Sequence, residues 1–455
     1  MNLKQKNIFL IFLMLCFTIT SSIIEIPLKS IEVKDVIKYK DIKIKEVEEE
    51  PKENNNFNQI SLIDEGSTKI SPSRLFLATI KISSNEQEFN LVLDTGSSYL
   101  WVPKKDSNDK TKIAHHFVPT SNSVNTNAPF KMEYGTGSCS GTYYEDTIKY
   151  INNKKFKFKF GVATVTDFSV EGADGIVGLS NYYSDKSTSI IHRLYEDGIT
   201  NSKKFSFKFG DNINTGQAGT LYIGEHKDFS KSDTVKCPLI NYKDSSNIFW
   251  GCYLSKFGIK NSKYEKNSSK VFDVIFDTGT NVIILPLDYL NDIESDLNNF
   301  GCEKYIDEKN KNYQLKCKNS DNLPNFRFEI NGNVLTVPYQ YSFYYVNSKY
   351  VYSRIIFKDV KFFKYKIIGS PFFFAFHTLF DQEGGNLYFH PEDIKNLEIG
   401  NGINSFTAAD LAAIVVIIIV LLGLAYIIYY IIKWKRAKKA LEDAIPQSDY
   451  VFYNN

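Results

Sequence analysis

The sequence predicts a mainly β protein made of two similar lobes that face each other across a cleft, followed by one transmembrane helix. One phrase, Asp-Thr-Gly followed by a hydroxyl residue, occurs twice, at residues 94–97 and 277–280. Short runs rich in Phe, Tyr, Ile and Val, punctuated by Gly, Asn and Asp, extend from residue 75 to 389, as expected of strands joined by turns. An uncharged apolar run follows at residues 411–432. The repeated phrase indicates a duplication, and the last run indicates a membrane span.

The composition fits a folded protein and argues against one class of partner. The 455 residues are 43% hydrophobic and 15% aromatic, which is enough for roughly two to three domain-sized cores. Lysine and arginine (54) nearly balance aspartate and glutamate (52), for a net charge of +2. Because no local basic face stands out, we expect no nucleic-acid partner.

The N-terminal residues have the order of a secretory signal peptide. Lysines precede an uncharged, mostly apolar run from Ile8 to Ile19, and small residues follow it. This run is short for a membrane span, so we expect residues 1–20 to be removed; a buried N-terminal helix or an uncleaved anchor is the alternative.

Residues 411–432 are predicted to form a transmembrane helix. At about 1.5 Å per residue, this run is long enough to cross the hydrocarbon core. Lysines and an arginine follow it at once, whereas Asp410 precedes it. Because positive charge favours the cytoplasmic side, residues 433–455 are expected to be cytoplasmic. The chain would then be a single-pass type I membrane protein with a lumenal or extracellular main domain.

The cysteines fit an oxidising compartment. Cys302 and Cys317 flank a short polar stretch, where a disulfide would restrict the unfolded chain. Cys237 and Cys252 lie symmetrically about a turn-like segment, so a hairpin would place them opposite one another. Cys139 is left over and is expected to be a buried, unreactive thiol.

Two aspartates that face each other can hydrolyse a peptide bond. Asp94 and Asp277 each follow an apolar run, one in each half of the chain. A carboxyl pair that shares one proton can act as base and as acid on a water molecule, without a metal or another cofactor. Since like charges at short distance do not both ionise easily, the pair should titrate in coupled steps and work best in acid.

The neighbours of both aspartates suit this role. Gly96 and Gly279 let backbone approach the carboxylates, and the hydroxyls of Ser97 and Thr280 can hydrogen-bond their outer oxygens. Each phrase also has a later echo, Ile-Val-Gly and Ile-Ile-Gly, whose glycine suits a strand that passes close beside the aspartate loop.

Residues 132–138 predict a hairpin whose tip can move over the cleft. An apolar and aromatic strand ends at Tyr134 and runs into Gly135 and Thr136. Ordinary strand surface is the alternative for Tyr134, and its place before the glycine-rich turn favours the hairpin. The better helix candidates are residues 187–198 and 286–297.

Together these motifs resemble the pepsin-like aspartic proteases. The segments that carry the resemblance are 93–103, 134–138, 173–179, 276–280 and 368–369. The resemblance covers about residues 70–392 and implies that Asp94 and Asp277 are the catalytic pair. It also implies that Tyr134 is the flap tyrosine and that Trp101 hydrogen-bonds it. The Lys/Asn/Ile-rich composition looks most like the plasmepsin branch of apicomplexan parasites.

One departure from the family concerns the segment after Trp101. Residues 104–116 contain no cysteine, although the family often has a small disulfide loop here. This segment must therefore be held in another way or be mobile.

Residues 24–29 resemble the start of the family's propeptide. This implies a zymogen whose lysines pair with the active-site carboxylates until acid weakens those pairs; a solvated edge strand is the alternative. The expected organisation is signal peptide 1–20, propeptide and linker 21–62, N-terminal lobe 63–235, C-terminal lobe 236–392, stalk 393–410, transmembrane helix 411–432 and tail 433–455.

The leading hypothesis is a membrane-anchored aspartic endopeptidase that acts as a monomer on polypeptides. A catalytically silent protein of the same fold, which binds peptides or a receptor in the cleft, is the alternative. It leaves the repeated aspartates, their hydroxyl partners and the flap unexplained.

Overall fold

The computed structural model describes most of the predicted lobes and little of the two ends. The described residues are 24–32, 74–109, 113–134, 137–149, 155–167, 172–181, 185–209, 219–240, 249–260, 271–307, 312–319, 322–345, 349–361, 366–398, 426, 428–437 and 439. They divide into two compact units, within residues 1–400 and 401–455. The predicted signal peptide lies outside the described residues.

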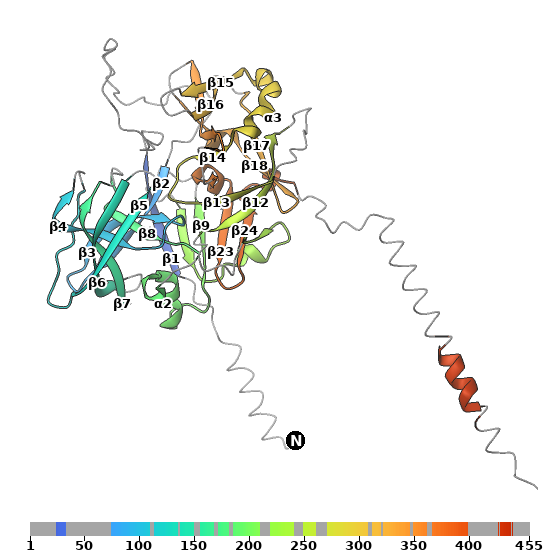
Figure 1. The fold of residues 1–455 in the computed structure, drawn as a ribbon, viewed down its shortest axis with the longest axis horizontal. Helices are drawn as coiled ribbons and strands as arrows, with labels where there is room; N and C mark the ends of the chain where they lie inside the picture. The colour runs from blue at the N-terminus through green and yellow to red at the C-terminus, as the bar shows by residue number, and fades with distance from the viewer. Residues whose placement is uncertain are drawn as a thin grey trace, which may run out of the picture. The chain divides into compact units, whose positions relative to one another are not determined.

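Within the first unit, the described strands form two large sheets (Figure 1). The thirteen strands of the first sheet, in spatial order, are β11 (Val235–Pro238), β24 (Asn386–Pro391), β23 (Phe376–Asp381), β9 (Lys204–Phe209), β10 (Gly219–Ile223), β1 (Ile24–Glu32), β2 (Arg74–Ile82), β3 (Gln87–Asp94), β8 (Gly175–Gly178), β4 (Trp101–Asp109), β7 (Lys155–Thr166), β6 (Gly137–Lys149) and β5 (Val124–Tyr134). This sheet therefore combines strands of both predicted lobes. Strands β23 and β24 belong to the predicted C-terminal lobe, and β2 to β10 belong to the predicted N-terminal lobe.

The second sheet belongs to the later half of the chain. Its twelve described strands are β19 (Phe343–Tyr345), β20 (Tyr350–Ser353), β16 (Asn312–Lys318), β21 (Ile355–Lys358), β14 (Ile283–Pro286), β22 (Ile367–Ile368), β13 (Phe272–Phe276), β12 (Gly251–Ile259), β17 (Phe326–Ile330), β18 (Asn333–Val337), β25 (Leu397–Glu398) and, paired with β16, β15 (Cys302–Asp307). The mainly β class predicted from the strand texture is confirmed.

Alternation of side chains explains why the strands form. In β7 the run Lys-Phe-Lys-Phe-Lys-Phe buries Phe156, Phe158 and Phe160 on one face. In β9 the phenylalanines Phe205 and Phe207 are likewise fully buried. Because successive side chains of a strand point to opposite faces, such a run places one apolar face on the core.

In the described part of the first unit, helices are few and short. They are η2 (Lys186–Thr188), α2 (Ile190–Glu196), η4 (Lys227–Ser230), α3 (Leu287–Leu297), η5 (Asn298–Phe300), α4 (Tyr339–Ser342), α5 (Ser370–Phe373) and η6 (Ile394–Asn396). Both predicted helical segments contain one, α2 and α3. The hydroxyl of Ser189 accepts a 3.2 Å hydrogen bond from the amide of His192 and so caps the start of α2.

The two Ile-x-Gly echoes lie where the sequence placed them. β8 runs parallel to β3, with Gly178 opposite Asp94, and β22 runs parallel to β13, with Ile368 opposite Phe276. A Cβ on Gly178 would collide with the backbone of Tyr99. Glycine is therefore required here by the close approach of a second backbone.

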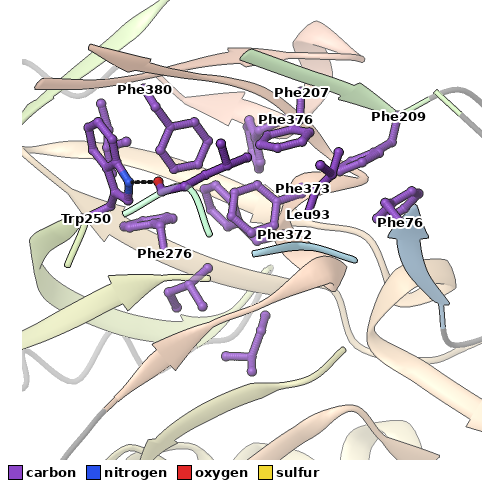
Figure 2. Packing of buried hydrophobic residues seen from close by; sticks show 14 of the residues in the cluster. Phe76, Leu93, Phe207, Phe209, Trp250, Phe276, Phe372, Phe373, Phe376 and Phe380 are labelled. Carbon is purple, nitrogen blue, oxygen red and sulfur yellow. Dashed lines mark hydrogen bonds between the residues drawn. The ribbon is translucent and has the colours of Figure 1, made fainter. Parts of the chain in front are cut away.

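A phenylalanine-rich core supports both aspartate loops (Figure 2). Leu93 and Phe276, which precede the two aspartates, are 1% and 0% exposed. Phe276 packs edge-on against Phe372, with ring centroids 5.3 Å apart. The indole of Trp250 donates a 2.7 Å hydrogen bond to the carbonyl oxygen of Leu179 and so joins the two halves of the chain. Close packing of this kind keeps the bases of the two loops in fixed positions.

The N-terminal described strand lies inside the first sheet. β1 pairs with β10 through residues 24–28 and with β2 through residues 29–32. Since β1 has a neighbour on each side, the alternative of a solvated edge strand is wrong for these residues. The rest of the predicted propeptide and linker lies outside the described residues.

Both predicted disulfides are present. Cys302 and Cys317 are directly opposite in the β15–β16 pair, as expected for a bridge across a small loop. Cys237 and Cys252 are also bonded, but the first lies on β11 and the second on β12, in different sheets. The bridge is therefore confirmed, whereas its expected geometry across two paired strands is wrong. Cys139 is free and buried, and burial raises the pKa of its thiol to about 12.

The segment without a cysteine after Trp101 is held by hydrogen bonds. The amide of Lys105 donates to the carbonyl oxygen of Phe117, and the amide of Phe117 donates to that of Pro103, at 3.0 and 2.7 Å. Asp174, whose side chain is 2% exposed, accepts from the amide of His115 at 3.1 Å. The Nδ1 atom of His115 lies 2.9 Å from the same carboxylate. These contacts hold the segment in which the family often has a disulfide loop.

The described part of the second unit is a short helix. Tyr426, residues 428–437 and residue 439 are helical, and the side chains of Tyr426 and Trp434 are 62% and 64% exposed. Among the described residues, no helix has both the length and the apolar character needed to cross a membrane. Most of the predicted transmembrane helix lies outside the described residues.

Candidate active site

The two aspartate loops are joined to each other by their threonines. The hydroxyl of Thr95 donates a 2.8 Å hydrogen bond to the carbonyl oxygen of Phe276, and that of Thr278 donates a 2.7 Å bond to the carbonyl oxygen of Leu93. Each threonine amide also donates to the hydroxyl of the other threonine, at 3.0 and 3.2 Å. This reciprocal set holds the end of β3 against the end of β13.

The carboxyl groups of Asp94 and Asp277 meet at the junction of the loops. Both Oδ1 atoms lie within 3.2 Å of the point where a Cβ on Gly279 would stand. The carboxyl carbon of Asp277 lies 2.8 Å from the corresponding point on Gly96. Any larger residue at Gly96 or Gly279 would therefore collide with the carboxyl groups, which explains why glycine occupies both positions.

The hydroxyl and amide donors around the two carboxyls follow the same pattern. Ser97 donates from Oγ to Oδ2 of Asp94, and Thr280 donates from Oγ1 to Oδ2 of Asp277, each at 2.5 Å. The amides of Gly96 and Gly279 donate to the Oδ1 atoms at 2.8 Å. The outer oxygens are thereby fixed, and the Oδ1 atoms of the two carboxyls face each other.

The environment of Asp94 favours its protonated form. Burial raises the pKa of Asp94 well above its usual value, and the negative charge of Asp277 raises it further. The hydrogen bond from Ser97 opposes this effect, because it stabilises the ionised carboxylate. The pair therefore retains a proton to higher pH than an isolated aspartate would.

The flap tyrosine is held by a hydrogen bond from Trp101. The indole Nε1 of Trp101 donates a 2.8 Å bond to the hydroxyl of Tyr134. Trp101 is fully buried, so it positions the phenol rigidly. Gly135 and Thr136, at the predicted flap tip, lie outside the described residues.

The structure brings together the two aspartates and their predicted glycine and hydroxyl partners, and it separately pairs Trp101 with Tyr134. The sequence interpretation missed Thr95 and Thr278. Both were read only as members of the Asp-Thr-Gly phrase. Their presence in both copies is a signal that was available, because a small turn does not by itself need a β-branched hydroxyl residue. Their role depends on the contact between loops that are far apart in the chain.

Two carboxyls in this geometry can activate a water molecule. One accepts a proton from the water while the other, which holds the shared proton, donates it to the substrate or to the leaving group. The Oδ2 atoms are engaged by the hydroxyls of Ser97 and Thr280, so the facing Oδ1 atoms are available to the water molecule and the substrate.

Comparisons with known proteins agree with the fold and the site. A family profile described as "Eukaryotic aspartyl protease" matches residues 75–391. Vacuolar protease A from Arthroderma otae is 28% identical over 280 residues, which cover 59% of this chain and 65% of that protein. Pepsin A from Gallus gallus is 27% identical over 271 residues, which cover 58% of this chain and 69% of that protein. This chain thus matches about two thirds of the length of these relatives.

A solved structure shows the same fold. The aspartic proteinase from Irpex lacteus aligns with a TM-score of 0.54 at 20% identity, over 70% of this chain and 94% of that chain. The family profile includes both Asp-Thr-Gly loops, the described flap strands and both Ile-x-Gly strands. This chain therefore belongs to the eukaryotic aspartyl protease family.

Proposed function

We propose that this protein is an aspartic endopeptidase that cleaves polypeptides with a water molecule activated between Asp94 and Asp277. The observation that carries the proposal is the meeting of these two carboxyls at loops joined by Thr95 and Thr278. Family membership supports the same reaction class.

The reaction follows from one proton shared by two carboxyls. The ionised carboxyl removes a proton from water, and the water oxygen attacks the peptide carbonyl carbon. The protonated carboxyl donates to the carbonyl oxygen, which gives a tetrahedral diol. Proton transfer to the nitrogen then breaks the C–N bond and returns the pair to its starting protonation. Water supplies the hydroxyl of the new acid and the hydrogen of the new amine.

The flap hydrogen bond has a positioning role in this proposal. The indole of Trp101 donates to the hydroxyl of Tyr134, and the hydroxyl of Ser97 donates to Asp94. A substrate strand bound beneath the flap would lie between Tyr134 and the two carboxyls.

Three further features belong to the proposal. The order of charged and apolar residues supports a signal peptide at 1–20 and a type I anchor at 411–432. The pairing of β1 inside the first sheet is consistent with a propeptide that folds with the enzyme. The plasmepsin-like affiliation rests on composition alone. The monomeric state is proposed because one chain supplies both aspartates of the site.

The direct test replaces each aspartate by asparagine. Asp94→Asn and Asp277→Asn each remove the shared proton's site while keeping the shape of the side chain, so peptide cleavage should fall by roughly a thousandfold or more. The assay is cleavage of a fluorogenic peptide between pH 4 and 7 by the acid-treated protein. Asp273→Asn, on an aspartate that is 65% exposed and paired with Lys366, is the matched control.

Two results would reject the proposed reaction. One is near-normal cleavage by either active-site variant, and the other is a parent protein that binds peptides without cleaving them at any of these pH values. The second result would instead establish the silent peptide-binding alternative.

A further inference from the structure

A second cluster of titratable side chains lies on η4 and β23, elements that do not carry the two aspartates of the active site. His226 precedes η4, Asp228 lies within it, and His377 is on β23. We propose that these three side chains form a binding site for a divalent transition metal of the zinc type. The site is independent of peptide hydrolysis.

The three ligand atoms are close enough to share one ion. One ligand atom of each residue lies within 4.8 Å of the other two. The Nδ1 atoms of His226 and His377 are each 3.6 Å from Oδ2 of Asp228. Tetrahedral zinc with bonds of about 2.0–2.1 Å separates neighbouring ligands by about 3.3 Å. Small side-chain rotations therefore bring the nitrogen–oxygen pairs to the required spacing, with water in the fourth position.

His377 supplies the strongest sign that an ion belongs here. Its side chain is 0% exposed, yet its Nδ1 atom has no hydrogen-bond partner. A buried polar atom without a partner is costly, because it has given up its hydrogen bonds to water. A metal ion bound at this nitrogen would provide the missing partner. A buried imidazole nitrogen that has no hydrogen-bond partner and lies 3.6 Å from a carboxylate oxygen is therefore a candidate metal ligand.

The other nitrogen of His377 is held as in a ligating histidine. Nε2 lies 3.0 Å from the hydroxyl oxygen of Ser206 on β9. When Nε2–H donates to Ser206, the Nδ1 lone pair points to Asp228. A hydrogen bond on the remote nitrogen fixes the tautomer and the ring orientation in most metal-binding histidines.

The site is reachable from solvent. The side chains of His226 and Asp228 are 12% and 11% exposed, whereas the rings of Phe229 and Tyr222 pack against His377 with centroids 4.5 and 5.9 Å away. These rings close one side of the cluster. An ion would therefore enter past η4. Its binding to His226 would replace the weak 3.3 Å hydrogen bond that the amide of Asp228 donates to Nδ1 of His226.

Two lysines compete with the metal for Asp228. Lys231 contacts Oδ1 at 3.0 Å, and Lys208 lies 3.8 Å from Oδ2, the oxygen assigned to the metal. Lys208 is 41% exposed, so its ammonium group can move into solvent when an ion binds. Repulsion between this ammonium and the metal should weaken binding, and its removal should strengthen it.

The test uses the purified full chain with Asp94→Asn, so that self-cleavage does not interfere. The protein is freed of metal with a chelator and titrated with Zn²⁺ by calorimetry, and with Co²⁺ by visible absorption. We expect one equivalent of Zn²⁺ to bind, to raise Tm, and to displace Co²⁺ whose spectrum shows four-coordinate nitrogen and oxygen ligation. His377→Phe and Asp228→Asn should each weaken Zn²⁺ binding at least about 100-fold.

Matched variants separate this site from other metal binding. Lys208→Met should bind Zn²⁺ several-fold more tightly, and His115→Phe, at an exposed histidine paired with Asp174, should bind like the parent. His377→Phe replaces one buried ring by another, apolar ring and so tests the loss of the nitrogen ligand. If His377→Phe does not fold, Asp228→Asn, on the more exposed η4, tests the site in its place. Absence of saturable Zn²⁺ binding, or binding by both ligand variants as tight as by the parent, would overturn the proposal without affecting the proposed peptidase.

Discussion

The hydroxyl of Thr95 accepts a 3.0 Å hydrogen bond from the amide of Thr278, and the amide of Thr95 donates a 3.2 Å bond to the hydroxyl of Thr278. The two side chains are 0% and 1% exposed. The relative position of the two carboxyls therefore depends on these two residues as well as on the aspartates themselves.

Thr95→Val should lower both stability and activity. Valine keeps the shape of threonine but leaves the amide of Thr278 without an acceptor and the carbonyl of Phe276 without a donor. Each unpaired group costs about 1–3 kcal/mol, and the altered spacing of the carboxyls should lower kcat. Chemical unfolding and peptide cleavage measure the two effects. Thr164→Val, at an exposed threonine with only a 3.4 Å contact, should change neither; equal effects of the two variants would contradict the role given to Thr95.

Trp101→Phe should impair the flap while the fold is kept. The variant loses the indole donor to the Tyr134 hydroxyl, so the phenol is less well positioned and kcat/KM should fall by roughly tenfold. A double-mutant cycle with Tyr134→Phe tests the link between them. If the two residues act through their shared hydrogen bond, the double variant should be hardly worse than the poorer single variant. Fully additive losses would show that they act separately.

Ser97→Ala should move the alkaline side of the pH–activity profile to higher pH. The Ser97 hydroxyl stabilises ionised Asp94, so its removal should raise the pKa of Asp94 further. Catalysis needs the shared proton and is lost as the pH rises through this pKa, which sets the direction of the shift.

The raised pKa of Asp94 also makes the stability of the fold depend on pH. Because the folded-state pKa of Asp94 is raised above its value of 3.8 in the unfolded chain, the contribution of Asp94 to stability is full below pH 3.8 and is lost as the pH rises through the folded-state pKa.

Ser98→Ala is the control for this profile. Ser98 is buried beside Ser97 but hydrogen-bonds the hydroxyl of Ser180, at 2.9 Å. Its replacement should leave the alkaline limb in place. A shift in the same direction in both variants would mean that loosening of the loop, and not the lost bond to Asp94, causes the effect.

Asp174→Ala should loosen the segment that follows Trp101. Asp174 accepts from the amides of Asn90 and His115 at 2.8 and 3.1 Å, and each amide left without a partner costs about 1–3 kcal/mol. His115→Ala removes only the contact of a ring whose side chain is 51% exposed, so its effect should stay within about 1 kcal/mol. Limited proteolysis between residues 104 and 117 measures the loosening. Equal protection in Asp174→Ala and the parent would exclude this anchoring role.

The sequence predicted features that depend on local chemistry. Each Asp-Thr-Gly phrase carries its aspartate, its hydroxyl partner and its glycine within four residues, so the site could be assembled from two short windows. The Ile-x-Gly echoes were equally readable because glycine marks a close approach between backbones. Their outcome, Gly178 opposite Asp94, confirms that interpretation.

Features that depend on distant partners could not be predicted in this way. Cys237 and Cys252 are near neighbours in sequence, yet their strands belong to different sheets, which no local pattern specifies. The cluster of His226, Asp228 and His377 depends on the docking of η4 against β23. Alternation identifies a strand such as β1 but does not identify its neighbours.

The nine residues of β1 connect the two parts of the first sheet, because β1 lies between β10 and β2. Its first half pairs with β10 and its second half with β2, so without it the thirteen strands would part into two separate groups. A cut anywhere between residues 33 and 73 would therefore release no domain. It would convert β1 from a covalent part of the chain into a bound peptide, which a synthetic copy of the same nine residues should be able to exchange.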